Sequence, residues 1–157
     1  MPDASLARRD WHGANSADRF PKLIVNGVAE DKEWTSVRQT KNFQDNHGVT
    51  DVNSQDIRCF QNKPGTSTAP VAAGQQLGFV AMSAVTHFGP VSFYMARVPE
   101  GKDINTWDGA GNVWFKAGEI SAVQTAGGLT SGEATWPAYS NYALPRLLPL
   151  PPFLLWV

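Results

Sequence analysis

Glycine and proline interrupt this chain so often that only short regular elements fit between them. Fourteen glycines and eleven prolines are spread along the 157 residues, and runs rich in β-branched and aromatic residues lie between them. No apolar repeat of 3.6 residues continues far enough to indicate a substantial helix. Short strands that recur between turn signals are typical of sandwiches and barrels, so we predict an all-β fold.

Five runs are predicted as strands, and the first of them ends in an Asn-Gly turn signal. They are residues 22–28, 56–61, 75–82, 91–98 and 112–117. Composition and hydrophobic patterning divide the chain into an irregular leader (1–17), a β-rich domain (18–140) and an apolar tail rich in proline and leucine (141–157). Proline lacks the N–H donor that a helix interior and a central strand require, so we assign neither to the tail.

Charge and motifs exclude several classes of function. The chain carries 13 Lys and Arg against 14 Asp and Glu, a net charge of −1, and no basic cluster, which disfavours nucleic acid and anionic membranes as partners. No segment has the roughly 20 apolar residues of a membrane-spanning helix. The first residues do not resemble a signal peptide. Nucleophile-elbow, phosphate-loop and zinc-protease motifs are absent, and sequence alone cannot place a glycosidase carboxylate pair.

Three histidines and one cysteine are the remaining chemical groups of interest. His12 lies in the leader and His47 in a turn-rich stretch, so both are expected to be solvated. His87 precedes a rigid Gly89-Pro90 corner between two predicted strands. Spacing alone leaves it either a structural residue or a ligand for copper or zinc. Cys59 is either an ordinary buried thiol or a cysteine without its disulfide partner.

Several stretches occur in an order that is specific to one family. They are "FPKLIVNGV", "VRQTKNFQDNHGVTDVNSQDIRC", "APVAAGQQLGF", "THFGPVSFYMARV" and "NVWFKAGE". Together they resemble the copper-dependent lytic polysaccharide monooxygenases of auxiliary activity family 9, formerly glycoside hydrolase family 61. The resemblance implies a fibronectin- or immunoglobulin-like β-sandwich and a copper cofactor held by two histidines. It also implies a secreted, monomeric enzyme that uses O₂ or H₂O₂ and an electron donor on cellulose or a related β-glucan.

The resemblance assigns a role to one histidine and leaves its partner missing. His87 in "THFGP" matches the family's second copper ligand. The family's first ligand, an N-terminal histidine with a free amine, would fall near Ala17. His12 lies about five residues earlier and has a peptide bond on its nitrogen, so it is the weaker metal candidate.

The far end of the chain also departs from the family pattern. Beyond Tyr139 the family continues with two core strands, an axial tyrosine and a cysteine that pairs with the counterpart of Cys59. We expect the two strands, the axial tyrosine and the second cysteine to be missing here. A reading-frame or splice-model error at both ends would produce this pattern. The sandwich is then incomplete at its C-terminus, and this polypeptide is inactive although its lineage is oxidative. The alternative is a non-catalytic carbohydrate-binding module whose six tryptophans and three tyrosines supply stacking surface.

Overall fold

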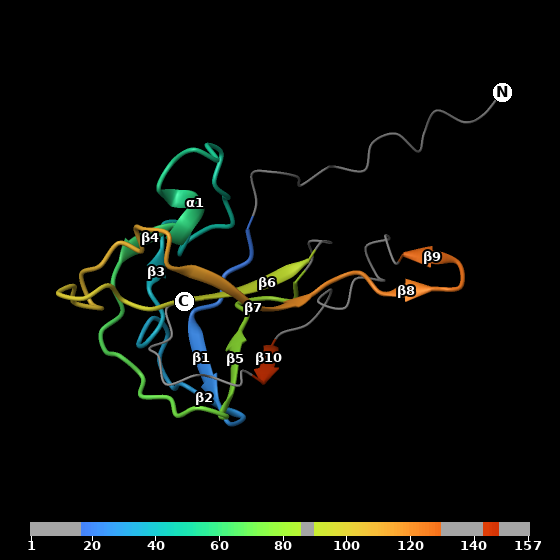
Figure 1. Ribbon diagram of the computed structural model, residues 1–157, viewed down its shortest axis with the longest axis horizontal. Coiled ribbons are helices and arrows are strands. Elements are labelled where there is room, and N and C mark those ends of the chain that lie inside the picture. The colour runs from blue at the N-terminus through green and yellow to red at the C-terminus, as the bar shows by residue number, and fades with distance from the viewer. Residues whose placement is uncertain (1–16, 86–89, 130–142, 148–157) are drawn as a thin grey trace.

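The computed structural model describes residues 17–85, 90–129 and 143–147, whose regular secondary structure consists almost entirely of short strands (Figure 1). The elements in chain order are β1 (Lys22–Val25), β2 (Val28–Ala29), β3 (Gln39–Thr40), α1 (Asp56–Cys59), β4 (Gln61–Lys63), β5 (Gln76–Val80), β6 (Val91–Ala96), β7 (Trp114–Ile120), β8 (Gln124–Thr125), β9 (Gly128–Leu129) and β10 (Ala143–Leu147). Among the described residues, no helix is long and apolar enough to span a membrane.

A four-stranded antiparallel sheet with the order β10-β5-β1-β2 forms one layer. The turn between β1 and β2 uses the Asn-Gly pair that the sequence indicated. Asn26 and Gly27 both have positive φ, +50° and +81°, as a type I′ turn requires. The side-chain oxygen of Asn26 also accepts the N–H of Gln76 at 3.0 Å, which joins the turn to the start of β5.

The antiparallel β6–β7 hairpin forms the second layer. Its register shifts between Phe93 and Tyr94, so that Phe93 pairs with Gly118 and Tyr94 with Lys116. The extra residue on β7 is Ala117, whose side chain packs on the buried core. A bulge of this kind increases the local twist of the hairpin.

The two layers meet in one hydrophobic core, and in Figure 1 the β6–β7 hairpin runs across the strands of the larger sheet. Leu23 from β1 and Leu77 and Phe79 from β5 pack with Met95 from β6. The rings of Phe79 and Phe93 stack between the layers with centroids 6.5 Å apart. Inner faces of two sheets that bury each other's apolar side chains define a sandwich, so the all-β prediction is confirmed.

The strand predicted for residues 56–61 is wrong over its first four residues. Asp56–Cys59 forms the short helix α1, and only Gln61–Lys63 is a strand. Two turns precede and overlap the start of α1. In the first, the Asp51 carbonyl accepts the N–H of Ser54 at 3.1 Å, and in the second, the Ser54 carbonyl accepts the N–H of Ile57 at 3.4 Å. Phe60 then ends the helix in the left-handed conformation while its N–H donates to the Asp56 carbonyl. The sequence analysis missed the Asp and Ser turn signals that precede the alternating run.

The tail also contains a strand that the sequence analysis did not assign. Ala143–Leu147 pairs antiparallel with β5 and forms the outer strand of the sheet. Pro145 lies opposite Gly78 in this pairing. Proline is tolerated there because one side of an edge strand needs no ladder hydrogen bond. The prolines of the tail are incompatible with a central strand, but they are compatible with the edge strand β10.

Candidate functional site

The segment that precedes β1 is tied to the loop of residues 42–47, which we call the polar loop. The N–H of Ala17 donates to the Asn46 carbonyl at 2.8 Å. The side-chain amide of Asn42 donates to the Ala17 carbonyl at 3.3 Å, and Asn42 is only 2% exposed. This bond satisfies one N–H donor of the buried amide and helps to fix the position of residue 17.

Arg19 continues this attachment and adds a second one. Its guanidinium donates to the Phe43 carbonyl at 2.7 Å and to the Asn46 side-chain oxygen at 3.1 Å. Its own carbonyl accepts the N–H of Met82 at 2.9 Å. The backbone around residues 17–19 is therefore bonded both to the polar loop and to the chain just after β5, five residues before His87.

The structure describes the chain on both sides of the predicted metal ligand. Val85, the last described residue before it, is buried, and the chain is described again from Pro90. Val91 then pairs with Ile120 at one end of the β6–β7 hairpin. His87 itself lies outside the described residues, as does His12, so their roles as copper ligands stay predictions.

His47 lies in the polar loop with its side chain 52% exposed, which confirms the loop-surface prediction. The Asp45 carboxylate contacts the Nδ1 atom of His47 and also accepts its backbone N–H at 3.0 Å. The ring meets Phe60 edge-on, with centroids 5.4 Å apart. The backbone N–H of His47, followed by its side chain, holds the pKa of Asp45 below its usual value of 3.8.

The described residues do not form a copper site among themselves. Within residues 17–85, 90–129 and 143–147, no three His, Cys, Asp or Glu side chains come together where they could hold a metal ion. His47 and Asp45 form only a pair, and one ring nitrogen already contacts the carboxylate. The nitrogen of Ala17 is an amide that donates a hydrogen bond, so it is not an amine donor for a metal.

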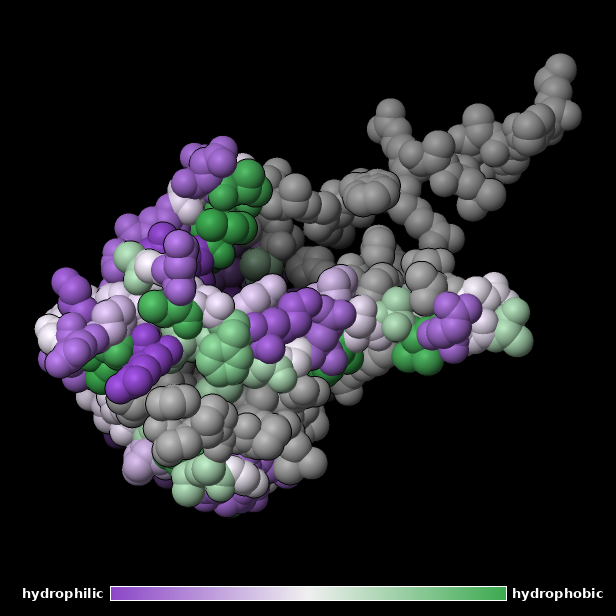
Figure 2. Space-filling view, viewed as in Figure 1, coloured by the Kyte–Doolittle hydropathy of each residue, from purple (hydrophilic) through white to green (hydrophobic). Residues whose placement is uncertain are grey.

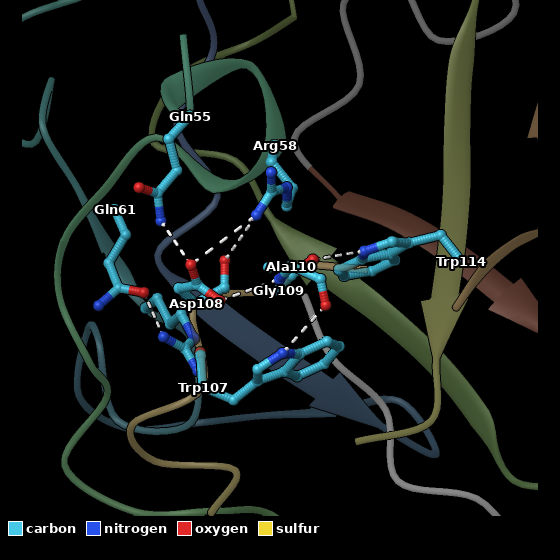
Figure 3. Close-up of polar contacts among 9 residues, drawn as sticks. Gln55, Arg58, Gln61, Trp107, Asp108, Gly109, Ala110 and Trp114 are labelled. Atoms are coloured by element: carbon cyan, nitrogen blue, oxygen red, sulfur yellow. Dashed lines mark hydrogen bonds and ion pairs between the residues drawn. The ribbon is translucent and has the colours of Figure 1, made fainter. Parts of the chain in front are cut away.

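A second buried cluster lies where β6 ends and β7 begins, and it includes side chains of the loop between them (Figure 3). Trp107 is 5% exposed and stacks on Trp114 with centroids 6.0 Å apart. Their indole N–H groups donate to the carbonyls of Ala110, at 3.2 Å, and Gly109, at 2.8 Å. Trp107 is therefore an interior side chain, and Trp114 is half-buried against it.

Polar side chains fix this cluster from outside. Arg38 donates to the carbonyls of Ile104 and Trp107 and to the side chain of Gln61. On the α1 side, Gln55 donates to the Asp108 carboxylate at 3.2 Å (Figure 3). The sequence analysis did not find this network, because its members are far apart in the chain and match no motif.

Hydrophobic side chains also gather on the surface over α1 (Figure 2). The exposed ones there are Val52, at 68%, and Ile57, at 58%. Their exposure follows from α1 itself, because a four-residue helix on a turn-rich loop has little neighbouring structure on which to bury them. Nothing in the described part of the chain covers this patch.

The fold defines the class of protein as an antiparallel β-sandwich, and sequence comparison defines the family. The model of Auxiliary Activity family 9 (formerly GH61) matches residues 18–146. The chain therefore belongs to this family of copper-dependent lytic polysaccharide monooxygenases.

Individual relatives agree with this assignment. The chain is 44% identical over 142 residues to AA9 family lytic polysaccharide monooxygenase H of Malbranchea cinnamomea, covering 87% of this chain and 59% of the relative. It is 41% identical over 152 residues to AA9 family lytic polysaccharide monooxygenase F of Neurospora crassa, covering 95% and 62%. The chain thus spans about three fifths of the length of these curated relatives.

Proposed function

We propose that this protein derives from an enzyme that cleaves the glycosidic bonds of cellulose or a related β-glucan oxidatively, and that His87 is a ligand of its copper ion. Family membership supports the reaction class, since the relatives are named lytic polysaccharide monooxygenases. The observation that supports the place of the site is the hydrogen bond from Met82 to Arg19. It joins the segment that leads to His87 to the backbone beside Ala17, where the resemblance puts the first ligand.

The residues of this chain would position the metal, and the metal would supply the chemistry. A neutral imidazole such as that of His87 is a good ligand for copper. Bound copper supplies the oxidative chemistry, with O₂ or H₂O₂ and an electron donor as co-reactants. Asn42 of the polar loop donates to the Ala17 carbonyl and Arg19 donates to the same loop, so these two residues would hold the backbone at the proposed first-ligand position. The family resemblance further leads us to propose a secreted, monomeric protein.

We also propose that the 157-residue polypeptide by itself does not turn over cellulose. The resemblance puts the first ligand near Ala17, whose nitrogen is an amide that donates its N–H to the Asn46 carbonyl. His12 also carries a peptide bond on its nitrogen, so it could offer its ring but no free amine. One imidazole without a chelating amine makes a weaker and less rigid copper site than two histidines do.

Copper titration of three proteins tests the proposed ligand. The unmodified chain should bind one copper ion weakly, and His87→Ala should abolish this binding. His47→Ala is the matched control, because it removes an exposed imidazole at a position not proposed as a ligand. Electron paramagnetic resonance of the Cu²⁺ form reports nitrogen ligation directly. Equal copper binding by the His87→Ala variant and the unmodified chain would refute the assignment of His87.

Product analysis on cellulose tests the proposed lack of turnover. With copper, ascorbate and H₂O₂ present, the unmodified chain should release no oxidised oligosaccharides, while a full-length relative in the same buffer should release them. Release of oxidised products by the unmodified chain would refute the proposed inactivity and would leave the family assignment unchanged.

One surface favours the alternative of a carbohydrate-binding module. Tyr94 is 50% exposed on the outer face of β6, and Ser92 and the Lys116–Glu119 ion pair lie on the same hairpin. An exposed aromatic ring with polar neighbours can stack on a sugar and bind its hydroxyl groups. Copper-independent binding to cellulose that Tyr94→Ala abolishes and His87→Ala leaves intact would support this alternative.

A further inference from the structure

The polar loop presents a hydrophilic surface beside the proposed position of the first copper ligand. Two of its turns close through backbone bonds, from Phe43 to the Thr40 carbonyl at 3.2 Å and from Asp45 to the Asn42 carbonyl at 3.0 Å. Residues 44–47, with the sequence Gln-Asp-Asn-His, are all exposed. Four consecutive side chains that can form hydrogen bonds therefore face solvent from a loop attached to Ala17.

Within this loop, His47 is held in one orientation by its neighbours. The Asp45 carboxylate contacts Nδ1, and the edge-on contact with Phe60 limits rotation of the ring. In the neutral imidazole, a proton on Nδ1 directed at the carboxylate leaves Nε2 as a hydrogen-bond acceptor. A ring that is already oriented loses little conformational entropy when a ligand binds to it.

We propose that His47 is a positioning residue that binds a hydroxyl group of the β-glucan chain beside the copper site. This inference rests on the proposed function, because the polysaccharide is the ligand that the family acts on. A glucan presents many hydroxyl groups, which suit an oriented imidazole acceptor and the neighbouring amide of Asn46. Metal binding is a poorer assignment for His47, because the described residues around it offer no set of three ligands.

Titration with cellohexaose in the absence of copper tests the proposal with four proteins. His47→Phe keeps an aromatic ring against Phe60 but removes both ring nitrogens, and the Kd should rise about three- to tenfold, the effect of one lost hydrogen bond between neutral groups. His47→Gln keeps a side-chain hydrogen-bonding group and should recover part of the affinity. Tyr94→Ala tests the rival surface on β6 and should leave the Kd unchanged.

Two further measurements separate binding from folding and from the copper proposal. The thermal midpoint of His47→Phe should match that of the unmodified chain, and its copper affinity should be unchanged. A Kd for His47→Phe equal to that of the unmodified chain would overturn the proposal, as would an unmodified chain that does not bind cellohexaose. Loss of affinity in Tyr94→Ala alone would overturn it in favour of the β6 surface. Failure of the copper proposal would instead appear as unchanged copper binding in His87→Ala.

Discussion

Replacing Gly65 by alanine should destabilise the sandwich at a point where two loops meet. A Cβ atom at this position would lie 2.6 Å from the Thr35 carbonyl oxygen and 3.2 Å from that of Val37. Both are backbone atoms, and Val37 belongs to the buried core, so neither can move aside cheaply. The Thr35 carbonyl also accepts the N–H of Ser67 at 3.0 Å, and displacement would weaken this bond.

The expected loss in the free energy of unfolding follows from the steric clash and from the weakened hydrogen bond. Overpacking against a well-packed region costs about 1–3 kcal/mol, and a weakened hydrogen bond adds about 1 kcal/mol. Alanine in place of glycine also stabilises by about 0.4–1 kcal/mol through the unfolded chain. Gly127→Ala is the matched control, because its Cβ would meet only the Thr125 hydroxyl at 3.9 Å and its backbone is not in the left-handed region.

Because both variants share the unfolded-state effect, their difference isolates the clash. Gly65→Ala should have a free energy of unfolding about 2–4 kcal/mol lower than that of Gly127→Ala. Urea denaturation followed by tryptophan fluorescence measures both values, and the slopes should agree if the transitions are two-state. A difference below about 0.5 kcal/mol, within the usual range of surface substitutions, would show that the loop of Gly65 does not approach Thr35 as closely as described.

Three further outcomes are expected. Leu77→Ala should lower the free energy of unfolding by about 2–5 kcal/mol, because Leu77 is 1% exposed between the two layers. Val28 is 73% exposed, so the control Val28→Ala should change the free energy of unfolding by less than about 0.5 kcal/mol. The hydrogen bond from Lys116 holds the pKa of Glu119 below 4.5, so this pair stabilises the fold above that pH and loses its effect as the pH falls through the folded-state pKa. The thermal midpoint of Glu119→Gln should therefore lie below that of the unmodified chain at about pH 7, and the difference should shrink as the pH falls through the folded-state pKa of Glu119; a constant offset would contradict this. Finally, a variant that begins at residue 17 and carries Ala17→His has a free amine and an imidazole at the proposed first-ligand position. Calorimetry should show that it binds copper at least tenfold more tightly than the unmodified chain. Equal affinity would show that this position lies away from the copper site.

Local sequence signals predicted the parts of the fold that local chemistry controls. The Asn26-Gly27 pair marked a tight turn because few other dipeptides accept positive φ at two successive residues. The apolar runs of β5 and β6 were recognisable because turn residues bound each of them. The same method failed at Asp56–Cys59, where alternation suggested a strand and the preceding turns instead start a helix. The turns before these four residues and the left-handed Phe60 after them determine that they form a helix.

The sequence by itself determined the family and the all-β class, because both depend on residue types in a linear order, and it proposed His87 as the second copper ligand. Tertiary structure alone decided that the backbone beside Ala17 meets Met82 and the polar loop, and that Asp45 and Phe60 fix the orientation of the His47 ring. The two backbone hydrogen bonds join residues that are 29 and 63 positions apart, and the orientation of the His47 ring depends on the exact turn geometry of a loop. Packing of the two layers brings such residues together, and no local pattern in the chain encodes it.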